Sequence, residues 1–197
     1  LARHESMTRE LGRRIGKEVE VVVEGRDTRV DKTILEKLDA PLTHLVRNAL
    51  DHGLEPPEAR LAAGKPRHGT VTLRAARDGE HVLLEIGDDG RGIDVAAVRR
   101  AAVERGVLSE PQAARLSDAD AIQLIYRPGL SSRRAATELS GRGYGLDEVE
   151  TAVRRMRGTI QVGSEPGRGA RFRIRIPDAG LGIVPCIRVR VGKRSFL

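Results

Sequence analysis

The chain has 197 residues, a length that favours one large domain with a shorter segment attached. Hydrophobic residues make up 39% of it, as in a globular protein, but aromatic residues make up only 2%, so the core must be aliphatic. So few rings disfavour a stacking platform for single-stranded nucleic acid. The formal net charge is +7, but the arginines alternate with Asp and Glu instead of clustering, which disfavours any direct nucleic-acid partner.

Cysteine content and hydropathy bear on the compartment. Cys186 is the only cysteine, so no disulfide can form within the chain, and a reducing compartment, the cytoplasm, is expected. No apolar run in the sequence approaches the roughly 20 residues that a membrane-spanning helix needs.

The first third of the chain predicts helices around one strand. Residues 1–16 have loosely helical apolar spacing, and residues 17–24 place valine at every second position, as in a half-buried strand. A short helix is expected over 31–38. A second helix is expected to begin at Asp39, with Pro41 in its first turn, and to end before Gly53.

The rest of the chain predicts two hairpins and several helices. Asp78-Gly79 is expected to join two strands, and a glycine-rich stretch at 127–145 without apolar periodicity is expected to be a mobile segment. The apolar run after 181 contains Pro185, which favours an edge strand. The predicted strands are 70–76, 82–86, 159–163 and 170–176, and the predicted helices are 56–64, 95–105, 118–126 and 146–157.

The helix before Gly53 carries the first candidate site. An apolar stripe of Leu42, Leu45, Val46 and Ala49 predicts its buried side, and short polar side chains lie roughly opposite. An Asn oxygen suits Mg²⁺ that already holds phosphates, and a neutral His can accept a hydrogen bond beside a reacting phosphoryl group. The alternative is an ordinary solvated face. The polar set consists of His44, Asn48, Asp51 and His52.

Two glycine-containing segments complete the candidate chemistry. Asp88-Asp89-Gly90-Arg91-Gly92 follows a predicted strand, where a carboxylate can accept a hydrogen bond from an amino group such as that of adenine. The alternative is a plain turn. Residues 141–146 (GRGYGL) lead into a helix, so their N–H groups could bind phosphate oxygens, whereas the alternative is a flexible linker.

The order of these segments resembles the ATP-binding fold shared by histidine kinases, DNA gyrase, Hsp90 and MutL, and most specifically the chemotaxis histidine kinase (CheA) family. The matching motifs are residues 41–53 (PLTHLVRNALDHG), 88–94 (DDGRGID), 127–132 (RPGLSS) and 140–147 (SGRGYGLD). The resemblance covers about Leu11 to Pro177. It implies a two-layer α/β sandwich with a mixed, mostly antiparallel sheet, helices on one face and a mobile ATP lid.

The resemblance also implies roles for individual residues. Asn48 would ligate Mg²⁺, His44 would lie near the γ-phosphate of ATP, and Asp88 would hydrogen-bond the adenine amino group. The remaining ATP-binding residues implied are Arg47, Asp51, His52, Gly90, Gly92, Ser131, Ser132, Gly141, Arg142, Gly143, Gly145 and Leu146.

The resemblance implies an ATP-dependent kinase that phosphorylates a histidine on a separate phosphotransfer domain. Further implied partners are a CheW-like adaptor with its chemoreceptor array and a downstream response regulator, and the full-length protein would be a dimer. Residues 1–16 would be the end of a dimerisation helix or a linker, residues 17–177 the kinase domain, and residues 178–197 a linker with the first strand of a truncated regulatory domain.

Three positions depart from the family pattern. Leu130 replaces a usual Phe, Tyr144 a small aliphatic residue, and Ala170 a Thr that supports the adenine-binding Asp. These departures leave open a degenerate kinase that binds nucleotide weakly and serves as a scaffold for adaptors. An ATPase of the gyrase type is disfavoured, because His44 stands where a water-activating Glu is needed.

Overall fold

The computed structural model describes residues 2–130, 145–178, 189–191 and 194–196, with side chains up to residue 178. The strands are β1 (Val19–Glu24), β2 (Gly69–Asp78), β3 (His81–Asp88), β4 (Thr159–Glu165), β5 (Gly169–Pro177), β6 (Val189–Val191) and β7 (Arg194–Phe196). The helices are α1 (Ala2–Arg14), α2 (Lys32–Asn48), the π-helix η1 (Ala49–Gly53), α3 (Pro57–Ala62), α4 (Val95–Glu104), α5 (Glu110–Arg115), α6 (Asp118–Gln123), the 3-10 helix η2 (Leu124–Tyr126) and α7 (Leu146–Arg155).

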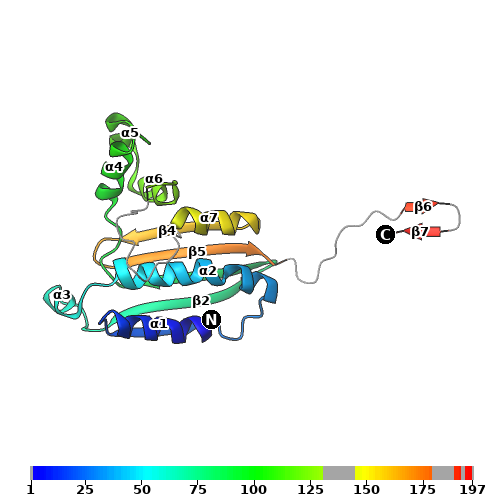
Figure 1. Ribbon diagram of the computed structural model, residues 1–197, viewed down its shortest axis with the longest axis horizontal. Coiled ribbons are helices and arrows are strands. Elements are labelled where there is room, and N and C mark those ends of the chain that lie inside the picture. Colours follow the sequence, from blue (N-terminus) through cyan, green and yellow to red (C-terminus); the bar gives the residue numbers. More distant parts are fainter. Residues whose placement is uncertain (1, 131–144, 179–188, 192–193, 197) are drawn as a thin grey trace.

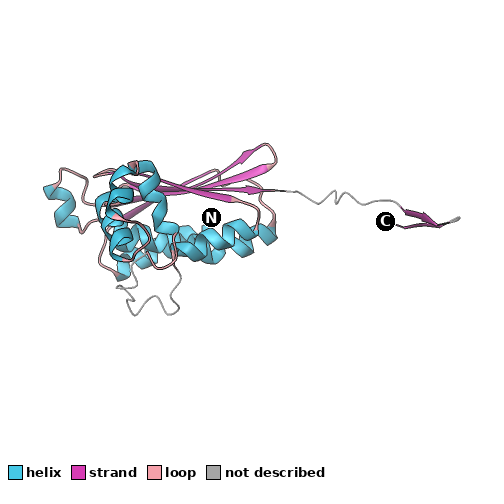
Figure 2. Cartoon of the chain, turned by 90° about the horizontal axis from the view of Figure 1, so that it is seen from above, coloured by secondary structure: helices cyan, strands magenta, loops and turns pink. Residues whose placement is uncertain are grey.

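The first five strands form one mixed sheet in the order β1-β2-β3-β5-β4. β1 pairs with β2 in parallel, because α2, η1 and α3 lie between them in the chain, and the other neighbours are antiparallel. Helices α1, α2 and α7 cover one face of this sheet (Figures 1 and 2). The predicted two-layer α/β sandwich with a mostly antiparallel sheet is therefore confirmed.

The core lies between the sheet and its covering helices. Alternate residues of each strand point into it, for example Val71 and Leu73 of β2 and Ile174 of β5, each at most 2% exposed. The stripe predicted on α2 is also buried, since Leu42, Leu45, Val46 and Ala49 all belong to the core. The aliphatic core expected from the composition is confirmed by these residues.

Helix α2 differs from its prediction. The chain does not break at Asp39: a single helix runs from Lys32 to Asn48 with Pro41 inside it, and Asp31 caps its start by accepting from the Thr33 N–H at 2.7 Å. Proline removes one intrahelical hydrogen bond, a loss of about 3 kcal/mol in a helix interior. Leu38, Pro41 and Leu42 are all buried on the same side of α2, so tertiary packing outweighs that loss.

The end of this helix also differs, because α2 stops at Asn48 and the chain continues as the π-helix η1. The Leu54 N–H donates to the Ala49 carbonyl at 2.8 Å, the wider i to i+5 bond of a π-turn. The α-helical spacing predicted for the polar set therefore holds for His44 and Asn48 but not for Asp51 and His52.

Several smaller differences concern the remaining elements. Helix α5 was not predicted, and α6 gives way to η2 after Gln123. Figure 1 shows α4, α5 and α6 gathered beyond the β4 edge of the sheet. After residue 188 the chain has two short strands, β6 and β7, paired with each other, where one strand was predicted.

Helix α1 packs against β1 and α2 and buries His4, which is 8% exposed. Burial lowers the pKa of His4, although hydrogen bonding to the Asp39 carbonyl and the Asp39 carboxylate oppose this. None of the helices described from residue 2 to 130 or from 145 to 178 is both long and apolar enough to span a membrane.

Candidate nucleotide-binding site

The last two turns of α2 carry the first part of the site. The Asn48 Nδ2 atom lies 2.9 Å from His44 Nε2, one helical turn away, and both residues are partly buried. An amide nitrogen only donates, so Nε2 accepts and the ring is neutral with its proton on Nδ1. This bond uses the amide nitrogen of Asn48 and not its carbonyl oxygen, which is the atom that a hard cation would require.

Electrostatics keeps His44 neutral. Burial lowers the pKa of His44, and the positive charge of Arg47 and the nearby His52 act in the same direction. The carboxylate of Asp147, from the first turn of α7, opposes the shift. The ring therefore stays a neutral hydrogen-bonding group near pH 7. The electrostatic effect of Asp147 reflects the packing of α7 against α2.

The second part of the site is Asp88, the last residue of β3, enclosed by backbone. A Cβ atom at Gly53 would lie 2.8 Å from Asp88 Cγ, and a Cβ at Gly169 would lie 1.9 Å from the Asp88 carbonyl oxygen. Gly169 has φ +99°, which only glycine adopts readily. The Gly90 N–H donates to Asp88 Oδ1 at 2.9 Å. Three glycines thus let three chain segments meet around one carboxylate, and we call this group (Asp88, Gly53, Gly90 and Gly169) the Asp88 cradle.

Burial raises the pKa of Asp88 to about 6, while hydrogen bonds from the Gly90 and Ala170 backbone lower it and the charges of Asp89 and Glu55 raise it further. Removal from water dominates because it disfavours the ionised form. A carboxyl group with such a raised pKa, set in a cradle without a cationic side chain among the causes, is typical of a ligand-binding position.

The glycine at position 92 has a similar steric role. Gly92 has φ +77°, and a Cβ there would lie 2.6 Å from the Glu165 carbonyl oxygen and 2.9 Å from Ser164 Oγ. Ser164 Oγ accepts from the Ile93 N–H at 2.8 Å and donates to the Gly169 carbonyl at 3.0 Å. The segment after β3 is therefore fixed against β4 and β5.

The other predicted site residues are placed as follows. Arg47 is partly buried on α2, Asp51 is partly buried in η1, and His52 is exposed. Gly145 is the N-cap of α7 and Leu146 its first residue, partly buried against the core. Ser131, Ser132, Gly141, Arg142 and Gly143 lie outside the described residues, as does Tyr144.

Two departures from the family pattern can be located. Leu130 is 7% exposed and belongs to the buried set. Ala170 lacks the Thr hydroxyl, but its backbone still hydrogen-bonds the Asp88 carboxylate. Asp88 therefore keeps a backbone hydrogen bond from β5 although position 170 has no side-chain hydroxyl.

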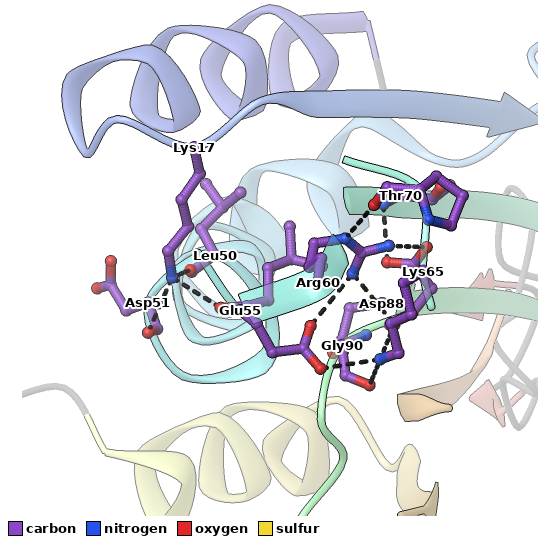
Figure 3. Close-up of polar contacts among 12 residues, drawn as sticks. Lys17, Leu50, Asp51, Glu55, Arg60, Lys65, Thr70, Asp88 and Gly90 are labelled. Carbon is purple, nitrogen blue, oxygen red and sulfur yellow. Dashed lines mark hydrogen bonds and ion pairs between the residues drawn. The ribbon is translucent and has the colours of Figure 1, made fainter. Parts of the chain in front are cut away.

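Sequence reasoning missed the charged residues that hold the site in place. The sequence analysis assigned no role to Arg60 or Lys65, yet Arg60 is 1% exposed and Lys65 reaches the turn after β3. Lys17 donates to the carbonyls of Leu50 at 2.5 Å and Leu54 at 2.8 Å, at the open end of η1 (Figure 3). The signal for these residues in the sequence was a Lys or Arg close to Gly or Pro. This pattern is too common to predict that a residue holds a site in place.

The protein offers few ligands for a metal ion. Residues 2–130 and 145–178 contain no group of three His, Cys, Asp or Glu side chains close enough to hold one. Mg²⁺ is often held by one or two protein oxygens together with substrate phosphates and water. The single carbonyl oxygen of Asn48 fits that kind of site.

Comparison with known sequences places the chain in a family. Residues 36–180 match the model of the "Histidine kinase-, DNA gyrase B-, and HSP90-like ATPase" family. The chain is 46% identical over 195 residues to the chemotaxis protein CheA of Treponema pallidum, covering 99% of this chain and 24% of that protein. It is 40% identical over 190 residues to the sensor histidine kinase CheAY of Helicobacter pylori, covering 96% and 24%. The chain therefore spans less than a third of the length of these relatives.

Solved structures agree on the fold. The histidine kinase domain of the blue-light activated kinase EL346 of Erythrobacter litoralis superposes with a TM-score of 0.53 at 18% identity, covering 90% of this chain and 63% of that one. The catalytic domain of the histidine kinase ThkA gives a TM-score of 0.52 at 14% identity, covering 88% and 86%. At such low identity these similarities concern the fold alone, and they confirm it.

The sequence matches confirm the resemblance predicted from the motifs. One of these relatives is a chemotaxis protein by name and the other a sensor histidine kinase, and neither name supports a degenerate scaffold. The chain therefore belongs to the histidine kinase-, DNA gyrase B- and HSP90-like ATPase family, as a domain of the CheA type.

Proposed function

We propose that this domain binds Mg-ATP and transfers the γ-phosphoryl group to a histidine on a separate phosphotransfer domain in chemotaxis signalling. The observation that carries the proposal is the hydrogen-bonded His44–Asn48 pair on α2, followed within five residues by the glycine that encloses Asp88. A metal-ligating oxygen and a base-recognising carboxylate are thus supplied from adjoining segments.

In this proposal the Asp88 carboxylate accepts a hydrogen bond from the adenine amino group. Support comes from the Asp88 cradle, where backbone N–H groups engage the carboxylate and hold its orientation. Gly90 and Gly92 keep the backbone free of side chains beside the base and sugar.

Phosphoryl transfer requires mainly positioning and charge stabilisation from the protein. Asn48 would hold Mg²⁺ through its carbonyl oxygen while His44 occupies its nitrogen. When bound, the cation neutralises charge on the phosphates. Neutral His44 would hydrogen-bond near the γ-phosphate, and Arg47, Asp51 and His52 would line the phosphate side.

The glycine-rich segment would complete the phosphate site. We propose that N–H groups of Gly141, Gly143 and Gly145 and the start of α7 at Leu146 bind phosphate oxygens. Ser131, Ser132 and Arg142 would add polar contacts from the lid.

The phosphoryl acceptor would lie outside this domain. His4 is 8% exposed and packed against Asp39, so it is not available to accept a phosphoryl group. The expected partners are a phosphotransfer domain, a CheW-like adaptor and a response regulator, with a dimeric full-length protein in the cytoplasm.

The test is phosphotransfer with γ-labelled ATP and Mg²⁺. The chain alone should acquire no label, whereas a supplied histidine-containing helical domain should acquire acid-labile, base-stable label. The same domain with its histidine replaced by Gln is the control. Self-labelling lost in His4→Ala would contradict the proposal, as would the failure of every supplied domain to acquire label together with no binding of ATP.

A further inference from the structure

A partly buried ion cluster lies beside the Asp88 cradle, and the predicted site residues did not include its members Glu55, Arg60 and Lys65. We call Glu55, Arg60, Lys65 and Asp89 the α3 ion cluster. Figure 3 shows the Glu55, Arg60 and Lys65 side chains converging on the chain segment that carries Asp88 and Gly90. Arg60 is 1% exposed, and a charged group so far from water is retained only where it has several partners.

Arg60 is the centre of the cluster. Its Nη2 atom donates to Asp89 Oδ2 at 2.8 Å, its Nη1 atom to Glu55 Oε2 at 3.2 Å, and its Nε atom to the Pro66 carbonyl at 2.9 Å. The planar guanidinium thus ties both ends of the α3 segment to the turn after β3.

Lys65 adds direct bonds to the backbone of that turn. Its ammonium group donates to the carbonyls of Asp89 at 2.9 Å and Gly90 at 2.8 Å, and to Glu55 Oε1 at 2.8 Å. Bonds to these two successive carbonyls restrain the peptide planes that follow Asp89 and Gly90, and so the turn that begins after Asp88.

Asp89 receives contacts on all its polar atoms. Its Oδ1 atom accepts from the Thr70 N–H at 2.9 Å, and its own N–H donates to the Thr70 carbonyl at 3.2 Å. With Oδ2 bonded to Arg60 and the carbonyl bonded to Lys65, Asp89 is fixed to both β2 and α3.

We propose that Glu55, Arg60 and Lys65 are positioning residues for adenine recognition: they hold the backbone of Asp89 and Gly90 so that the Asp88 carboxylate keeps the orientation that receives the base. This inference rests on the proposed role of Asp88. Neither cation is hydrogen-bonded to Asp88 itself, and the cluster contains two positive and two negative groups. The cluster therefore has no net charge and holds the turn through hydrogen bonds, while the charges of Asp89 and Glu55 also act on the Asp88 carboxylate.

A purely stabilising ion cluster would explain the contacts less well. Replacing a buried ion pair by apolar residues is often neutral or stabilising, so stability alone does not require one. Here the Lys65 ammonium group donates to the two backbone carbonyls that follow Asp88. This geometry sets the orientation of the turn and also contributes to its stability.

The test is a double-mutant cycle with ATP and Mg²⁺, measured by calorimetry. Lys65→Met should weaken ATP binding about tenfold in the parent chain and less than about twofold in Asp88→Asn, because the second background has lost the contact that Lys65 positions. Arg67→Met is the matched control: Arg67 lies two residues away and pairs with Glu18 and Glu58, not with the turn. It should leave ATP binding unchanged.

A second readout follows the turn itself. Amide hydrogen exchange at Gly90 should become at least about tenfold faster in Lys65→Met and stay unchanged in Arg67→Met. Arg60→Lys keeps the positive charge but loses the planar, forked donor group of the guanidinium, so amide exchange at Gly90 should become faster by an intermediate amount. This variant also leaves Glu55 and Asp89 with a cation beside them.

The outcomes separate the two proposals. Equal loss of ATP affinity by Lys65→Met in both backgrounds, or unchanged exchange at Gly90, would overturn the positioning role. Unchanged ATP binding in Asp88→Asn would overturn the adenine contact of Asp88, and faster exchange at Gly90 would in that case still assign the turn to Lys65.

Discussion

The two ends of the site are built differently. At the Asp88 end, backbone from three segments encloses the carboxylate, and the α3 ion cluster restrains the following turn. At the His44 end, two partly buried side chains on one helix are joined by a single hydrogen bond. The Asp88 end is thus held mainly by contacts within the chain. In the proposed function, the His44 end instead offers side-chain groups to the ligand.

This difference suits the two parts of a nucleotide. A rigid, planar base is recognised best by groups already held in one geometry, because no ordering is required on binding. Phosphates and a divalent cation bring their own charge and can complete the coordination of a side chain such as Asn48. The two ends are linked directly, because Asn48 is followed at once by η1, which ends at Gly53 beside Asp88.

The largest effect is expected at the His44 end. Asn48→Ala should reduce phosphotransfer at least about a hundredfold, the scale of losing one group that stabilises transition-state charge. The midpoint of thermal unfolding should change little, because Asn48 is only partly buried. Gln161→Ala, on the exposed face of β4, removes a comparable amide as a control. Full activity in Asn48→Ala would show that this end needs no metal ligand from α2.

The next effect concerns base recognition at the Asp88 end. Asp88→Asn should cost about 1.5–3 kcal/mol of ATP binding, the scale of a hydrogen bond to a charged group. Discrimination between ATP and GTP should weaken equally, which calorimetry with both nucleotides measures. If the variant bound ATP like the parent, Asp88 would be a turn residue only.

The cradle itself can be disrupted without removing a polar group. A Cβ at Gly90 would lie 2.0 Å from the Gly53 carbonyl oxygen, so Gly90→Ala should lower the free energy of unfolding by about 1–3 kcal/mol and weaken ATP binding. Gly163→Ala is the matched control, because its added Cβ meets nothing within 4 Å. Equal denaturation midpoints for the two variants would argue against a close-packed Asp88 end.

Acid should affect stability and nucleotide binding in opposite directions. The pKa of Asp88 is about 6 in the folded chain against an ordinary 3.8, so the folded state binds the proton more tightly than the unfolded state. Stability contributed by this group therefore rises by about 1 kcal/mol as pH falls from 7.5 to 5, whereas ATP binding weakens as the acceptor is protonated. Denaturation and calorimetry at both pH values, with Asp88→Asn as reference, test this. A parent chain that follows Asp88→Asn in both measurements would contradict it.

A last effect, on stability alone, is expected at Lys17, which lies just before β1 and bonds to the link between the two ends. Lys17→Met should lower the free energy of unfolding by about 1–2 kcal/mol, because the Leu50 and Leu54 carbonyls lose a charged donor. The exposed Lys32→Met is the control. A change in ATP binding larger than the change in stability would show that η1 transmits strain to Gly53.

The sequence by itself determined the layers of the fold and predicted the main site residues, whose roles are part of the proposed function. The apolar stripe of α2 and the alternation in β1 to β5 were readable because burial imposes a period of 3.6 or 2 on the residues that face the core. His44, Asn48 and Asp88 were found because few residue types serve their chemistry, and their order along the chain resembled one family.

Only the tertiary structure decided how these parts meet. Pro41 stays inside α2, where it is buried together with Leu38 and Leu42, η1 replaces the last α-helical turn where Leu54 bonds to Ala49, and Arg60 and Lys65 contact the turn after β3. The contacts of Arg60 and Lys65 with the turn after β3 join residues distant in sequence, whereas the bond that defines η1 joins residues five apart. Local propensity carries no information about tertiary packing. That Pro41 stays inside a helix, that the helix ends in a π-turn, and that Arg60 and Lys65 contact the turn after β3 is therefore known only from the folded structure.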